Sequence, residues 1–155
     1  MAEMKFKFTI QPYQTEAVDS VVGVFAGQPF NDHFTYRRDV EIRRDVTNWM
    51  LSDEELYMGF ANAKVQLDYG QLLVNIRRIQ TRNNIKLSDS LKSGGLGVCS
   101  LDVEMETGTG KTYVYIKTMF ELNKLYGWSK FIVVVPSIAI REGVQKSFET
   151  MQEHF

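Results

Sequence analysis

The sequence predicts an α/β fold in which helices pack against a parallel sheet. Phe131–Val135 is apolar and β-branched almost throughout, which is typical of a strand buried on both faces. Tyr113–Tyr126, which comes before it, repeats apolar residues at helical spacing, and Val98–Met105 reads as an earlier strand. Strand, helix and strand in this order form a βαβ unit, whose two strands lie parallel in one sheet.

The first 29 residues are predicted to form an extended arm followed by a helix. Lys5–Ile10 alternates polar and apolar residues, as a short strand does. Pro12 suits the first turn of a helix, and Gly27 with Pro29 would end that helix. We therefore divide the chain into this N-terminal unit (1–29), a middle segment (30–97) and the βαβ unit (98–155).

The middle segment, residues 30–97, carries no motif that indicates a function. Ser52–Glu55 has the pattern of a helix start with a capping box. Gln71–Ile79 fits a strand as well as a helix, because a short apolar run does not distinguish them. We treat residues 30–97 as an insertion of unknown role.

Composition indicates an ordinary water-soluble domain. The chain has 155 residues, enough for about one domain, with 44% apolar and 24% charged residues. Its net charge is −1, so any contact with nucleic acid must be local. The single cysteine, Cys99, excludes a disulfide framework, and no apolar run approaches the length of a membrane span. We expect a cytoplasmic protein with no membrane partner.

The loop between the first predicted strand and its helix has the pattern of a phosphate-binding P-loop. Gly108 and Gly110 allow the backbone to curl with its N–H groups pointing inward, at the positive end of the helix dipole. Lys111 would reach the β- and γ-phosphates, and the Thr112 hydroxyl would bind Mg²⁺. Met105 stands where the full pattern has its first glycine. The predicted nucleotide-binding residues here are Thr107, Gly108, Thr109, Gly110, Lys111 and Thr112.

Two glutamines at the start of the first predicted helix are candidates for reading adenine. A glutamine amide offers one acceptor and two donors, which match the N6 donor and N7 acceptor of adenine. Gln14 is the first choice and Gln11 the second, with Tyr13 or Phe8 available to stack on the base. Alone, these glutamines would be assigned to the solvated face of an amphipathic helix, but the P-loop favours the adenine role.

Three motifs give the chain a family resemblance. The string Thr107–Thr112 resembles the P-loop of superfamily-two helicases and translocases, and Pro12–Gln14 resembles their adenine-reading element. Met105–Val114 together with Val134–Val144 resembles the restriction subunit of type III restriction–modification enzymes. The resemblance implies a RecA-like P-loop motor domain that uses ATP and Mg²⁺, with Lys111 as the catalytic lysine.

The resemblance also implies partners. The family's enzymes are ATP-dependent DNA translocases and endonucleases that act with a methyltransferase subunit. Pro136, Ser137 and Arg141 match the family segment that touches the DNA backbone, and their chemistry suits phosphate oxygens. An alternative is an ordinary connection between a strand and a helix with a surface arginine.

The chain stops before the strand that would carry the Walker B carboxylates, and no nuclease constellation is present. We therefore expect the amino-terminal part of a larger ATP-dependent hydrolase, which alone binds nucleotide at most. Two alternatives stay open: a superfamily-two helicase unrelated to restriction, and a free-standing ATP-binding or docking module.

Overall fold

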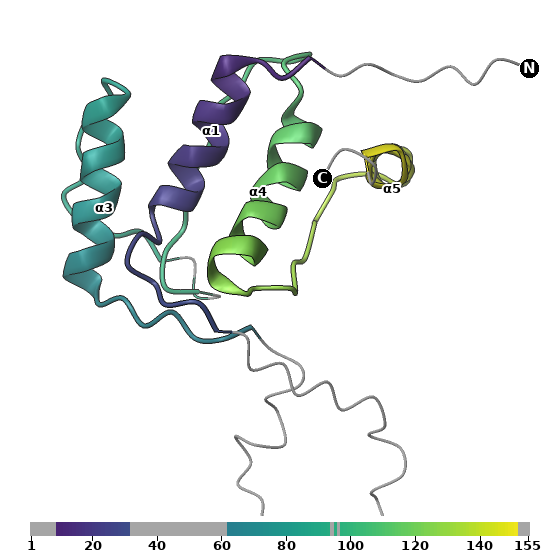
Figure 1. Ribbon diagram of the computed structural model, residues 1–155. Coiled ribbons are helices and arrows are strands. Elements are labelled where there is room, and N and C mark those ends of the chain that lie inside the picture. The colour runs from purple at the N-terminus through teal and green to yellow at the C-terminus, as the bar shows by residue number, and fades with distance from the viewer. Residues whose placement is uncertain (1–8, 32–61, 94, 96, 152–155) are drawn as a thin grey trace, which may run out of the picture.

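The computed structural model describes residues 9–31, 62–93, 95 and 97–151, and within these ranges the chain forms four α-helices. Helix α1 packs between α3 and α4, and α5 lies on the far side of α4 (Figure 1). None of these helices is long and apolar enough to cross a membrane. The helices are α1 (Pro12–Gly23), α3 (Tyr69–Arg82), α4 (Lys111–Tyr126) and α5 (Ile138–Met151).

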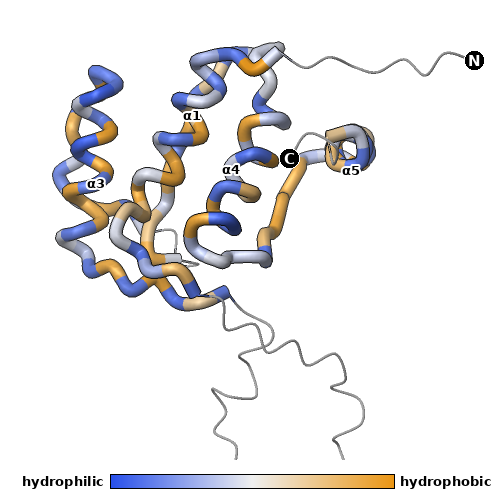
Figure 2. Tube along the Cα trace, viewed as in Figure 1, coloured by the Kyte–Doolittle hydropathy of each residue, from blue (hydrophilic) through white to orange (hydrophobic). Residues whose placement is uncertain are grey.

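The predicted parallel sheet, and with it the RecA-like α/β class, is wrong for the part of the chain that the structure describes. No strand forms there, and the segments Val98–Met105 and Phe131–Val135 have no strand assigned. A strand requires a neighbour that exchanges ladder hydrogen bonds with it, whatever its own sequence favours. The apolar segment between α4 and α5 instead lies at the surface (Figure 2). Ile132 is 93% exposed and Val134 is 88% exposed.

At the starts of α1 and α3, a glutamine side chain in the first turn accepts a hydrogen bond from the backbone N–H of the residue before the helix. The backbone N–H of Gln11, before α1, donates to the Gln14 side-chain oxygen at 3.2 Å, and Pro12 occupies the first turn. At α3, Asp68 accepts from the Gln71 N–H at 2.8 Å, and its own N–H donates to the Gln71 side chain. Each pair satisfies backbone donors that a helix start leaves free. The second pair resolves the strand-or-helix ambiguity of Gln71–Ile79 in favour of a helix.

Helix α4 ends at a glycine, and α5 begins after a serine cap. Gly127 ends α4 in the left-handed conformation, with φ 76°, which glycine adopts without strain. Ser137 precedes α5, and its hydroxyl accepts from the Ile140 N–H at 3.3 Å. The Ser137 side chain therefore caps the start of α5. The predicted capping box at Ser52–Glu55 lies outside the described residues.

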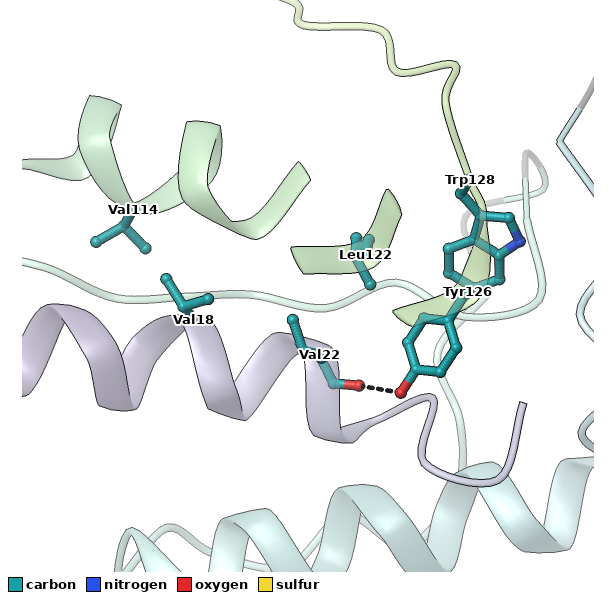
Figure 3. Close-up of a cluster of buried hydrophobic side chains, with 6 residues drawn as sticks. All are labelled: Val18, Val22, Val114, Leu122, Tyr126 and Trp128. Carbon is teal, nitrogen blue, oxygen red and sulfur yellow. Dashed lines mark hydrogen bonds between the residues drawn. The ribbon is translucent and has the colours of Figure 1, made fainter. Parts of the chain in front are cut away.

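The core lies between α1 and α4 (Figure 3). Its aromatic end is tied down by hydrogen bonds, because the Tyr126 hydroxyl donates to the Val22 carbonyl at 3.1 Å and the Trp128 ring N–H donates to the Ala63 carbonyl at 3.1 Å. Phe25 meets the Trp128 ring edge-on at 4.9 Å. The cluster therefore fixes α4 against α1. Its buried members are Val18, Val22, Val114, Leu122, Tyr126 and Trp128.

Both flanks of residues 32–61 are fixed to the end of α4. Before the gap, the Asn31 N–H donates to the Tyr126 carbonyl at 3.4 Å. After it, the Asn62 side chain accepts from the backbone N–H groups of Ser129 and Lys130, at 3.0 and 2.9 Å, and donates to the Lys130 carbonyl at 2.7 Å. Asn31 and Asn62 therefore both lie close to the end of α4.

Candidate functional site

The predicted P-loop is a short turn that connects Val98–Met105 to α4. Gly108 and Gly110 have φ of 83° and 86°, the left-handed region that glycine adopts without strain. The Thr109 hydroxyl donates to the Glu106 carbonyl at 2.6 Å, and the Thr109 N–H donates to the same oxygen at 3.4 Å. The turn is therefore held in one shape by its own residues.

The loop leads into the start of α4, which no side chain of its N-cap residue caps. Gly110 is the N-cap residue of α4 and has no side chain with which to cap it, whereas Asp68 and Ser137 cap α3 and α5. An uncapped helix start presents N–H donors and the positive end of the helix dipole to a ligand. Among the described residues, no atom lies within 4 Å of the position that a Cβ would take at Gly108. The approach to the loop at this glycine is therefore clear.

Lys111 and Thr112 follow Gly110 as the first residues of α4. The Lys111 side chain is exposed and Thr112 is half-buried. A lysine at this position places a mobile positive charge beside the open helix start. A threonine hydroxyl next to it offers one oxygen to a hard cation such as Mg²⁺. In the described ranges, no group of three or more His, Cys, Asp or Glu side chains could hold a metal ion.

Gln14 is brought directly against the loop. Its side-chain nitrogen donates to the Thr109 carbonyl at 3.0 Å, across 95 positions of sequence, while its oxygen accepts from the Gln11 N–H. A Cβ at Gly110 would lie 2.5 Å from the same nitrogen. The structure therefore joins Gln11, Gln14 and the loop in one cluster. Sequence reasoning missed the contact with Thr109, because no local pattern signals a partner so far along the chain.

A groove of about 860 Å³ opens beside the loop, between α1, α3 and the segment Ser100–Glu106. Its volume lies in the range of small-molecule sites. Tyr13, a predicted stacking residue, lines the groove, and so does Thr109 of the loop. Phe8, the other predicted stacking residue, lies outside the described residues. The groove therefore lies next to the candidate P-loop, since Tyr13 of α1 and Thr109 of the loop both line it.

The predicted DNA-contacting residues lie at another place, at the start of α5. Pro136, Ser137 and Arg141 are all exposed. At this helix start, the Arg141 N–H donates to the Ser137 carbonyl and the Ser137 hydroxyl accepts from the Ile140 N–H. The structure does not join them to the P-loop cluster through any of these bonds. They form a separate exposed helix start.

Two side chains, Cys99 before the loop and Tyr126 at the end of α4, have raised pKa values. Burial raises the pKa of the Cys99 thiol above 9.0, so it is a poorer nucleophile than a free thiol. Burial likewise raises the pKa of the Tyr126 phenol above 10.0. Neither shift favours chemistry near neutral pH. Cys99 therefore fits the structural role that its place before the loop suggests.

Comparison with known proteins identifies the family. The family model described as "Type III restriction enzyme, res subunit" matches residues 73–154, which include the P-loop, α4 and α5. Over 153 residues, 96% of this chain, it is 34% identical to the EcoP15I Res subunit of Escherichia coli. Over 146 residues, 93% of this chain, it is 34% identical to the EcoPI Res subunit of Escherichia phage P1.

A third relative is more similar over a shorter stretch. The StyLTI Res subunit of Salmonella typhimurium is 50% identical over 58 residues, 36% of this chain and 6% of the relative. The chain spans only 14% and 13% of the EcoP15I and EcoPI subunits. All three relatives are Res subunits of type III restriction–modification enzymes. The chain therefore belongs to the family of type III restriction enzyme Res subunits.

Proposed function

We propose that this chain is the ATP-binding amino-terminal part of a Res subunit, and that its P-loop binds the phosphates of ATP. The observation that carries the proposal is the glycine turn at Gly108–Gly110, which leads into the uncapped start of α4. Such a turn points backbone N–H groups and a helix dipole at one spot, which suits an anion. Lys111 and Thr112 at this spot supply the charge and the hydroxyl that a nucleotide–Mg²⁺ complex requires.

Each residue has a defined role in the proposal. The backbone N–H groups of the loop and of the first turn of α4 hold the phosphate oxygens. Lys111 neutralises the charge of the terminal phosphates, and the Thr112 hydroxyl orients Mg²⁺. Bound Mg²⁺ offsets the charge that develops on the phosphates during hydrolysis. Gln14, which is bonded to Gln11, lies against the loop at the phosphate end of the proposed site.

For the longer Res subunit, we propose ATP-driven translocation on double-stranded DNA and DNA cleavage, in association with a methyltransferase subunit. The relatives' names, as subunits of restriction–modification enzymes, support this assignment. In this chain, the start of α5 would contribute phosphate contacts through Pro136, Ser137 and Arg141. An exposed helix start with an arginine one turn in suits phosphate oxygens without reading sequence.

Calorimetric titration with ATP and Mg²⁺ tests the nucleotide assignment. Lys111→Ala should weaken ATP binding about 10- to 100-fold, because a charged hydrogen bond contributes about 1.5–3 kcal/mol. Lys124→Ala is the matched control, since Lys124 lies on the same helix but in its last turn. Equal ATP affinity in the wild type and the Lys111 variant, with the fold intact, would contradict the proposal.

A further inference from the structure

We propose that Gln14 is a positioning residue of the P-loop, which sets the direction of the Gly110 N–H before any nucleotide arrives. The inference rests on the proposed nucleotide site and deepens it. It assigns to Gln14 an effect on phosphate binding that does not depend on the base. The starting observation is the hydrogen bond of 3.0 Å from the Gln14 side-chain nitrogen to the Thr109 carbonyl.

The first step concerns the peptide unit between Thr109 and Gly110. In a trans peptide, the carbonyl oxygen of one residue and the N–H of the next point in opposite directions in one plane. A bond that holds the Thr109 oxygen against α1 therefore turns the Gly110 N–H away from α1. Gly110 is the N-cap of α4, so this N–H lies among the donors that a phosphate would use.

The second step is that Gln14 is itself held in place. Its oxygen accepts from the Gln11 N–H at 3.2 Å, which fixes the amide plane, and its side chain is half-buried. The amide therefore bridges the start of α1 and the loop, with both polar atoms engaged in protein bonds. A side chain pre-oriented in this way positions its partner at little entropic cost.

The third step concerns space. A Cβ at Gly110 would lie 2.5 Å from the Gln14 nitrogen, closer than such atoms approach. Glycine at position 110 is required by its φ of 86°, and a side chain there would also displace the Gln14 amide. At the other end of the turn, Thr109 is held to the Glu106 carbonyl. The orientation of this peptide is therefore determined from both sides.

A comparison of three ligands separates positioning from base reading. Dissociation constants are measured for ATP, GTP and inorganic tripolyphosphate, each with Mg²⁺, in the wild type and in Gln14→Met. Methionine keeps the length of the side chain but can neither donate to Thr109 nor accept from Gln11. We expect all three dissociation constants to rise by the same factor, about 3- to 10-fold, the size of one hydrogen bond. The ratio between ATP and GTP should stay unchanged.

The matched control is Gln71→Met. Gln71 accepts the same kind of N-cap hydrogen bond, from the Asp68 N–H at 2.9 Å, but at α3. Gln71→Met loses one helix-start bond, whereas Gln14→Met loses such a bond and the bond to Thr109, so both should lower the melting temperature and Gln14→Met should lower it more. Only Gln14→Met should weaken the three ligands. Loss of the preference for ATP with unchanged binding of tripolyphosphate would show that Gln14 reads the base, and would overturn the inference.

A second readout needs no ligand. In amide NMR spectra of the unliganded chain, Gln14→Met should shift the Gly110 N–H signal and speed its hydrogen exchange, whereas Gln71→Met should leave both unchanged. An unshifted Gly110 signal would overturn the inference whatever the nucleotide results are. A wild type that binds none of the three ligands, with Gly110 shifted in the Gln14 variant, would refute the proposed function and leave the positioning of the loop established.

Discussion

The hydroxyl of Tyr126 joins the end of α4 to the end of α1, since it donates to the Val22 carbonyl at 3.1 Å in a buried setting. Tyr126→Phe removes the hydroxyl, so the Val22 carbonyl loses this hydrogen bond. We expect the free energy of unfolding in urea to fall by about 1 kcal/mol. Tyr13→Phe is the control, because Tyr13 is exposed and should change stability by less than about 0.5 kcal/mol. Equal midpoints for the Tyr126 variant and the wild type would contradict this role.

The same phenol should make the fold sensitive to alkali. Burial raises its pKa in the folded chain above its usual value of 10.0, so the folded state keeps the proton longer than the unfolded state does. Its contribution is complete below pH 10.0 and is lost as pH rises through the folded pKa. Burial also raises the pKa of the Cys99 thiol above its usual value of 9.0, so the thiol's contribution to stability is likewise lost as pH rises.

Urea unfolding followed from pH 7 to pH 11 tests this sign, with pH values chosen to span both groups. We expect wild-type stability to fall over the alkaline part of this range, and the fall to be smaller in Tyr126→Phe. The same experiment on Cys99→Ala shows how much of the fall in stability comes from the Cys99 thiol. A fall of equal size in the wild type and in the Tyr126 variant would exclude this phenol as a cause.

Among the helices, the end of α4 is the most constrained. Gly127 has φ 76°, and a Cβ there would overlap the backbone carbonyl oxygen of Asn31. Because that neighbour is backbone, it cannot move aside cheaply. Gly127→Ala should lower the free energy of unfolding by at least about 1–2 kcal/mol, the cost of a left-handed alanine.

Gly143→Ala is the opposite case and the control for this prediction. Gly143 lies within α5, and apart from its chain neighbours and the backbone of its own helix no described atom lies within 4 Å of its Cβ position. Alanine in a helix interior should stabilise by about 0.5–1 kcal/mol relative to glycine. Melting temperatures of the two variants should therefore move in opposite directions. A neutral Gly127→Ala would mean that α4 does not end as described.

Local sequence signals predicted the helices well because their causes are local. Pro12, Gly127 and Ser137 each mark a helix end through their own backbone or side-chain chemistry. The apolar run in α3 fits a strand as well as a helix, and the Asp68–Gln71 pair at its start is the local signal that favours the helix. The features of the candidate site likewise differ in whether local sequence determines them. The glycine turn is encoded locally, whereas the contact of Gln14 with Thr109 depends on the packing of α1 beside α4.

For the molecule as a whole, the error of the sequence prediction lies in the strands. Phe131–Val135 has strand propensity, but a strand exists only when a neighbouring segment pairs with it. In the described chain this segment is exposed instead, with Ile132 and Val134 almost fully accessible. Exposed apolar segments of this kind promote association between molecules.

This exposure gives a prediction. Ile132→Thr with Val134→Thr should change the free energy of unfolding by less than about 0.5 kcal/mol, because neither side chain is buried. The same double variant should self-associate less than the wild type in sedimentation velocity. Destabilisation by about 2 kcal/mol or more would show that these side chains are packed inside the fold, and would contradict the helical arrangement described above.

The central claim is that the turn before α4 holds the phosphates of a nucleotide, and amide NMR during titration with ATP and Mg²⁺ tests it most directly. We predict saturable shifts that are largest at Gly108, Gly110, Lys111 and Thr112, and that need about 10- to 100-fold more ATP to saturate in Lys111→Ala. Saturable shifts confined to the groove residues Ser88, Ser90 and Leu91, or no shifts in a folded sample, would contradict it.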